Sequence, residues 1–228
     1  MRLVDRIVRV IAEAAASAEI AFDPANLEDD LAQRTAWTPL KGGGTNMHTH
    51  VLRSHSAWHV SFEPRRWALA FPSVFIVVGV GAAVAMGSQA AAEGPLAVAF
   101  GLLFGVVFVG AGVLILRGML QPRHFDRTLG YYWKGRARQD GHGIEALNEH
   151  CRLDEIHAVQ LIRERCSGKN RAYFSYELNL VKHDGSRLNV VDHGKVVALR
   201  SDAAQLATLL DVPLWDATQP TAASRLVA

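Results

Sequence analysis

The fold of this chain is decided by one apolar stretch, which reads WALAFPSVFIVVGVGAAVAMGSQAAA over residues 67–92 and GPLAVAFGLLFGVVFVGAGVLIL over residues 94–116. Glu93 is the sole charged residue between the two runs. An α-helix rises about 1.5 Å per residue, so about 20 apolar residues cross a hydrocarbon layer of about 30 Å. The alternative, a core helix of a soluble protein, is usually shorter and carries polar residues at helical spacing. The sequence therefore predicts a hairpin of two transmembrane helices, at about residues 67–88 and 94–116.

Basic residues flank this hairpin on its two outer sides. Arg65 and Arg66 precede it, and six basic residues against the single acid Asp126 lie within residues 117–138, whereas residues 87–95 between the helices hold no Lys or Arg. By the positive-inside rule, this asymmetry places both termini in the cytoplasm. Basic side chains near a membrane surface also attract anionic lipid headgroups. The candidates for lipid contact are Arg65, Arg66, Arg117, Arg123 and Arg127.

Small residues recur at helical spacing within both apolar runs. They let two helix backbones approach closely, which is how membrane helices gain packing. We expect the hairpin to pack through Gly79, Ala83 and Gly87 of the first helix and Gly101, Gly105 and Gly112 of the second; self-association of the chain is the alternative use. Neither predicted span holds an ionisable residue, so a proton or ion relay through the bilayer has no carrier.

The flanking segments have the patterns of a soluble α+β domain. Residues 1–35 predict a helical segment, with an amphipathic helix over 2–20 and a short second helix through 26–33. Residues 36–66 predict a β-hairpin before the membrane, with strands at about 47–53 and 57–63. Residues 117–216 predict a mostly antiparallel sheet closed by an amphipathic helix that carries Val196, Leu199, Ala203, Leu206 and Leu210. Whether the early hairpin joins this sheet is left open, and residues 217–228 read as a loose tail.

Four local patterns refine the β prediction. Phe174, Tyr176, Leu178 and Leu180 alternate with Ser175, Glu177 and Asn179, as in a half-buried strand. The Asp184-Gly185 pair predicts a hairpin turn. Gly42, Gly43 and Gly44 read as a flexible loop rather than a phosphate-binding loop, because no helix follows them. Gly194 reads as a strand end whose backbone conformation other residues avoid.

After the membrane, six stretches carry a resemblance: Phe125-Asp126-Arg127, Trp133-Lys134-Gly135, and residues 153–160, 176–181, 183–187 and 190–194. In these stretches the sequence resembles a group of uncharacterised bacterial inner-membrane proteins. Their cytoplasmic domain is similar to pleckstrin-homology (PH) sheets that follow a transmembrane hairpin. The resemblance implies an architecture and a location in the bacterial inner membrane, as a multi-pass protein, but no established activity or catalytic residues. The resemblance covers residues 125–216 best.

Histidine is the one residue type that suggests chemistry. His48, His50, His55 and His59 crowd one segment, and imidazole is a common metal ligand. Residues 48–59 contain no Asp, Glu or Cys that could complete a set of metal ligands, and the spacing of the histidines matches no recognised zinc or iron motif. His150 and Cys151 are adjacent, so in a strand they point to opposite faces and cannot form a nucleophile pair.

These observations favour a non-enzymatic, membrane-anchored module without a cofactor, whose cytoplasmic β domain binds a protein or lipid headgroups. The alternative is a metal-dependent or redox enzyme that uses the four histidines, with His48 and His50 as the first ligands to test. The expected partners are the lipid bilayer and either another protein or a second copy of the chain. A net charge of +2 gives no reason to expect nucleic acid.

Overall fold

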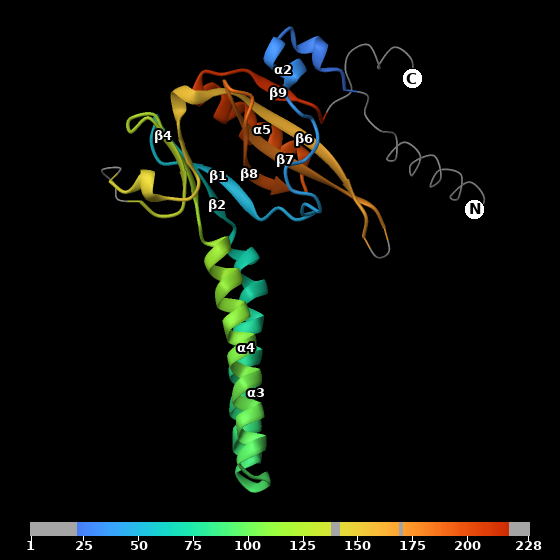
Figure 1. Cartoon of the computed structure of the whole chain (residues 1–228), viewed down its shortest axis with the longest axis vertical. Coiled ribbons are helices and arrows are strands. Elements are labelled where there is room, and N and C mark those ends of the chain that lie inside the picture. Colours follow the sequence, from blue (N-terminus) through green and yellow to red (C-terminus); the bar gives the residue numbers. More distant parts are fainter. Residues whose placement is uncertain (1–21, 138–141, 169–170, 219–228) are drawn as a thin grey trace, which may run out of the picture.

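The computed structural model describes residues 22–137, 142–168 and 171–218, and the expected helix over residues 2–20 lies outside them. A stalk of two long helices projects from a domain of two β-sheets and shorter helices (Figure 1). The stalk comprises α3 (Ala70–Glu93), which follows the 3₁₀ turn η2 (Arg66–Leu69), and α4 (Pro95–Met119). The mixed α+β class is thus confirmed.

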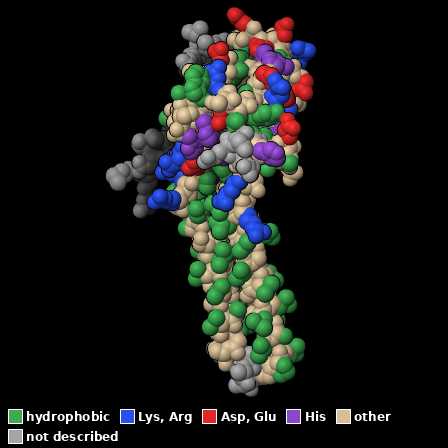
Figure 2. Space-filling view, turned by 90° about the vertical axis from the view of Figure 1, so that its left-hand side faces the viewer, with side chains coloured by type: hydrophobic (Ala, Val, Ile, Leu, Met, Phe, Trp, Pro, Cys, Tyr) green, Lys and Arg blue, Asp and Glu red, His purple; other side chains and the backbone are tan. Residues whose placement is uncertain are grey.

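The stalk helices are long and apolar enough to cross a membrane. Their mean hydropathy is 2.3 over Arg66–Ser88 and 2.6 over Pro95–Met119, and only 11% and 17% of the most apolar window is buried in the structure. Val77, Leu96 and Leu114 are between 69% and 84% exposed. Apolar side chains cover the stalk along its length (Figure 2). These helices are therefore not the buried core of a soluble domain.

Glycine sets the distance between α3 and α4. A Cβ on Gly105 would lie 2.6 Å from the Cβ of Ala83, and a Cβ on Gly101 would lie 2.7 Å from that of Met86. The space at Gly79 and Gly112 is similarly small: a Cβ on Gly79 would lie 2.9 Å from the Cβ of Phe108, and a Cβ on Gly112 would lie 2.7 Å from Cγ1 of Ile76. Gly87 differs from the prediction, because a Cβ there would meet nothing within 4 Å. The facing position one residue earlier is Met86, so Gly87 is rotated away from α4 by one residue of helical turn.

The first sheet joins strands from both sides of the stalk. It is fully antiparallel in the order β1-β2-β3-β4-β5 and pairs His59 with Asp126 and Phe62 with Arg123 across β2 and β3. The early hairpin therefore belongs to the same sheet as the later strands, and residues 36–66 and 117–216 form one domain into which the stalk is inserted. The strands are β1 (His50–Ser54), β2 (His59–Pro64), β3 (Arg123–Asp126), β4 (Tyr131–Lys134) and β5 (His150–Arg152).

The second sheet has the order β8-β7-β6-β9. Its pairs are antiparallel except for the parallel pair of β6 and β9. The turn between β7 and β8 has Gly185 at φ 81° and Asp184 accepting from Ser186 N, as the Asp-Gly pair predicts. The strands are β6 (Ile156–Cys166), β7 (Tyr173–Lys182), β8 (Arg187–His193) and β9 (Leu214–Asp216); the helix α5 (Val196–Leu210) follows β8, and the 3₁₀ turns η3 (Ile144–Ala146) and η4 (Leu153–Glu155) flank β5.

The core lies between the two sheets and is closed by α5. Every core side chain in it is at most 6% exposed. Such side chains each contribute about 1.5–3 kcal/mol by leaving water. The core draws on Val60, Phe62, Phe125 and Tyr132 from the first sheet, Val159, Leu161, Leu178 and Leu180 from the second, and Leu199, Ala203 and Leu206 from α5.

The segment before β1 covers the outer face of the second sheet. It contains two short helices, η1 (Pro24–Leu27) and α2 (Asp30–Arg34), where one was expected, because Glu28 at φ 52° ends the first. Leu40 N and Lys41 N donate to the carboxylate of Glu177, and Gly43 N and Gly44 N donate to that of Glu164. The glycine-rich stretch is thus held by the sheet rather than loose.

This cover changes two expectations for the second sheet. Ser175, Glu177 and Asn179 are at most 3% exposed, although their face of β7 was expected to meet solvent. Gly194 does not have a positive φ; a Cβ there would lie 1.9 Å from the carbonyl oxygen of Asn46. Gly194 is required because the covering segment passes against its backbone, not for its dihedral angles.

Candidate functional site

The junction of stalk and domain gathers basic side chains. The stalk enters after Pro64 and leaves before Arg123, and the neighbouring ends of β2 and β3 lie there side by side. Because β4 runs back antiparallel to β3, Lys134 lies opposite Arg123 at this same end. Lys and Arg side chains mark the junction in Figure 2, directly above the apolar surface.

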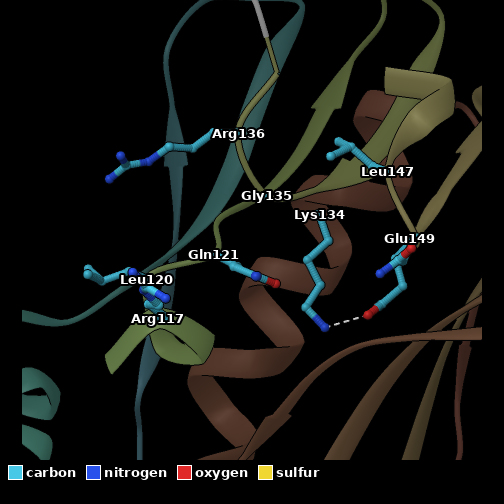
Figure 3. Close-up of a pocket in the computed structure, with 9 residues that line it drawn as sticks. Arg117, Leu120, Gln121, Lys134, Gly135, Arg136, Leu147 and Glu149 are labelled. Carbon is cyan, nitrogen blue, oxygen red and sulfur yellow. Dashed lines mark hydrogen bonds and ion pairs between the residues drawn. The ribbon is translucent and has the colours of Figure 1, made fainter. Parts of the chain in front are cut away.

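A pocket of about 490 Å³ opens at this junction, between the end of α4 and the chain that links β4 to β5 (Figure 3). Lys134 Nζ and Glu149 Oε2 point toward each other and are 2.5 Å apart. With Arg117 and Arg136, both exposed, the pocket has three basic groups against one carboxylate, so it favours an anion. Its lining comprises Arg117, Leu120, Gln121, Lys134, Gly135, Arg136, Leu147, Asn148 and Glu149.

The structure separates the five arginines that were expected to meet lipid. Arg66 and Arg117 are exposed at the junction. Arg65 instead donates from Nη1 to His48 Nδ1 at 3.0 Å, and Arg123 donates from Nη1 to His50 Nε2 at 2.7 Å. Arg127 lies at the opposite end of β3, about 13 Å away along the strand, with its guanidinium 5.4 Å from the Trp58 ring.

Lys134 and Arg136 are the pocket residues that the candidate set missed. They belong to the basic run over residues 117–138, which was the available signal. The sequence did not predict that Lys134, at the end of β4, lies next to the stalk, because this position depends on the pairing of β4 with β3.

The four clustered histidines divide into two sites. His48 packs against His193 with ring centroids 4.1 Å apart, beside His50 at the junction. His55 and His59 lie at the far end of β2, where His59 Nε2 is 3.1 Å from His124 Nδ1 and His55 Nε2 is 2.7 Å from Ser61 Oγ. Within the described ranges, no group of three or more His, Cys, Asp and Glu side chains is arranged to hold a metal ion.

Burial and neighbouring basic groups hold the pKa values of His50, His193 and His124 below the usual value of an imidazole. Burial lowers the pKa of His50 to about 3, with further contributions from Arg123, His193 and Lys134. Burial and then His48 lower the pKa of His193 to about 4. At the far end of the sheet, burial and then His59 and His55 lower the pKa of His124 to about 4.

Cys151 and His150 do not form a nucleophilic pair. Cys151 is 3% exposed, and burial raises the pKa of its thiol to about 12. A thiol with such a pKa is not the reactive thiolate at neutral pH. His150 Nδ1 lies 2.8 Å from the carbonyl oxygen of Leu147, on the other face of β5 from Cys151.

No protein-family model, curated protein or solved structure matches the chain. The argument about function therefore depends on the geometry of the junction.

Proposed function

We propose that this chain is a non-enzymatic module that binds anionic phospholipid headgroups at the cytoplasmic surface of a bacterial inner membrane. The stalk crosses the membrane twice, both termini lie in the cytoplasm, and the two sheets closed by α5 form a PH-like domain. Support comes from the hydropathy of α3 and α4, from the basic residues at their domain ends and from the antiparallel sheets.

The observation that carries this proposal is the position of the basic pocket. Arg117 lies in the last turn of α4, directly after the apolar run ends at Leu116. In the proposed topology it stands at headgroup depth, with Arg136 and Lys134 beside it in the same pocket. Each basic group near an anionic surface contributes about 1 kcal/mol. Leu120 and Leu147 add apolar walls for the glycerol and upper acyl region of a lipid.

The test uses the full chain in lipid nanodiscs that contain phosphatidylcholine and a minor fraction of phosphatidylglycerol. We expect phosphatidylglycerol to be enriched among the lipids that remain bound on transfer to mild detergent. Arg117→Gln and Arg136→Gln should each weaken the enrichment about fivefold, as the loss of about 1 kcal/mol requires.

Arg127→Gln is the matched control, because Arg127 is equally exposed but lies at the far end of β3. The proposal is wrong if the bound lipids match the bulk composition, or if R127Q weakens the enrichment as much as R117Q. Topology is tested separately with reporters placed in the turn near residue 94 and after residue 228, which should lie on opposite sides of the membrane.

A further inference from the structure

A second cluster lies at the junction, apart from the basic pocket. It gathers side chains from the segment before β1, from β1, from the start of the stalk, from β3 and from the end of β8. We call it the root cluster and define it as His48, His50, Arg65, Arg123 and His193. Arg65 immediately precedes η2 and Arg123 opens β3, so the cluster brackets both points where the stalk meets the sheet.

Hydrogen bonding fixes where the protons sit on two of these imidazoles. An arginine side chain can only donate, so His48 Nδ1, 3.0 Å from Arg65 Nη1, accepts, and Nε2 of the neutral ring carries the hydrogen. By the same argument His50 accepts from Arg123 at Nε2 and donates from Nδ1 to Thr49 Oγ1 at 3.0 Å.

Three buried nitrogen atoms of the root cluster have no hydrogen-bond partner among the described residues: His48 Nε2, His193 Nε2 and Arg123 Nε. His193 is fully buried, and its Nδ1 accepts from Lys195 N at 3.1 Å, so Nε2 of the neutral ring carries the hydrogen. Buried polar groups are almost always hydrogen-bonded, because an unpartnered one has lost its hydrogen bonds to water without replacement. All three nitrogen atoms are therefore donors, so the partner they require is an acceptor.

The surroundings of the root cluster are positive. The charged groups that act on His48 are Arg65 and Lys195, and those that act on His50 and His193 are Arg123, Lys134 and Arg65. The acids that act on Arg123 are Glu149 and Asp192. Both are engaged elsewhere, Glu149 with Lys134 Nζ and Asp192 with Asn189 Nδ2.

We infer that the root cluster binds a phosphate group, whose oxygens accept from the Nε2 atoms of His48 and His193 and pair with Arg65 and Lys195. The phosphate comes either from a lipid phosphodiester or from free phosphate, which share this chemistry. The site is independent of the basic pocket, whose lining contains none of the five cluster residues.

Proton uptake on binding follows from this arrangement. Without an anion, burial and the neighbouring cations hold the pKa values of His48, His50 and His193 below the usual value. A bound phosphate supplies the missing negative charge and raises these pKa values toward the usual one. Affinity for a phosphodiester, whose own charge is fixed in this range, therefore increases as the pH falls from neutrality, and its binding takes up protons; for inorganic phosphate, the protons that the ion itself gains or loses are subtracted from the measured uptake.

The experiment titrates inorganic phosphate into the full chain in a nonionic detergent and follows the histidine side-chain resonances by NMR. The His48 and His193 resonances should move, whereas those of the exposed, distant His183 should stay fixed. Calorimetry in two buffers of different ionisation enthalpy should show proton uptake. Phosphatidylglycerol in the same detergent is the second arm; tighter binding there identifies the lipid as the source, and tighter binding of inorganic phosphate identifies the free ion.

Two pairs of variants make the test specific. His48→Phe keeps the ring contact with His193 but removes Nε2–H, and should weaken phosphate binding about tenfold, as expected for one charge-assisted hydrogen bond; His183→Phe should not. Arg65→Gln should weaken binding similarly, while Arg66→Gln, its exposed neighbour, should leave it unchanged. The inference is wrong if neither phosphate source shifts the His48 and His193 resonances, or if binding occurs without proton uptake. It is also wrong if R65Q and R66Q reduce the phosphate affinity equally.

Discussion

The insertion of the stalk between two paired strands makes a strong prediction about which fragments fold. Residues 117–216 alone lack β1 and β2, and therefore Val60 and Phe62, which are 2% and 0% exposed in the core. Burial of these two side chains contributes about 3–6 kcal/mol at about 1.5–3 kcal/mol each. The backbone hydrogen bonds between β2 and β3 add about 1 kcal/mol apiece. A whole domain is stable by only about 5–15 kcal/mol, so the isolated fragment should not fold.

The matched protein removes the stalk and keeps both sets of strands. Phe62 pairs with Arg123, and continuation of this register places Pro64 opposite Gln121. Residues 22–64 joined to residues 121–218 by Asn-Gly thus close β2 and β3 with a two-residue hairpin turn. This spliced chain should fold without detergent.

Both proteins are measured by urea titration followed by far-UV circular dichroism, and by the dispersion of amide resonances. The spliced chain should show one cooperative transition with a slope of about 1–3 kcal/mol per molar urea, and residues 117–216 none. Cooperative unfolding of residues 117–216 alone would refute the continuous domain. A spliced chain without a transition would refute it equally, because its sheet loses no strand.

Three further predictions concern the stalk, the histidines and the covering segment. The first variant is Gly105→Ala, whose added Cβ would lie 2.6 Å from the Cβ of Ala83. In an SDS unfolding titration it should destabilise the helix pair by about 1–3 kcal/mol, whereas Gly110→Ala, whose Cβ would meet nothing within 4 Å, should not. Equal effects of the two variants would contradict the packing of α3 against α4. In the folded chain the pKa of His50 is lowered to about 3 and that of His193 to about 4, whereas in the unfolded chain each has the ordinary value of 6.5. As the pH falls, these histidines are therefore protonated in the unfolded chain before they are protonated in the folded one. Stability measured with urea should therefore be full above about pH 6.5 and fall toward about pH 4, by roughly 3 kcal/mol per histidine, and His50→Gln should flatten the profile. Gly194→Ala should release the segment before β1, seen as faster proteolysis near Asn46, because its Cβ would lie 1.9 Å from the Asn46 oxygen; unchanged cleavage argues against this contact.

The parts of the fold that follow from local sequence were predictable. The two long helices require only an uncharged run longer than a bilayer, and Leu178 and Leu180 require only the period of a strand. The small-residue spacing of the stalk located Gly101, Gly105 and Gly112 at the interface. It placed Gly87 there in error, because one residue turns a helix by about 100° and Met86 faces Gly101 instead.

The parts that depend on distant pairing were not predictable. No local pattern shows that β2 finds β3 beyond a stalk of two helices, and this pairing decides where Lys134 and Arg127 lie relative to the junction. His48 and His59 were grouped because they are close in sequence. In the structure they lie at opposite ends of the sheet, because β1 starts at the junction and β2 starts at the far end. Glu177 looked exposed by alternation, and only the segment before β1, whose backbone amides bind it, explains its burial.

The pairing of β2 with β3 also limits how the stalk can move relative to the domain. Neighbouring strands are about 4.8 Å apart and packed helices about 8–10 Å, so the stalk widens only slightly as it leaves β2 and β3. A tilt of the stalk relative to the domain must therefore move Arg65 against His48 and Arg117 against Lys134, since each arginine lies within a few residues of a helix end. A ligand at either proposed site would contact residues of the stalk ends and of the domain, Arg117 with Lys134 in the basic pocket and Arg65 with His48 at the root cluster. In the proposed topology, headgroup binding thus favours one angle between domain and membrane, because only a ligand that discriminates between two arrangements shifts their populations.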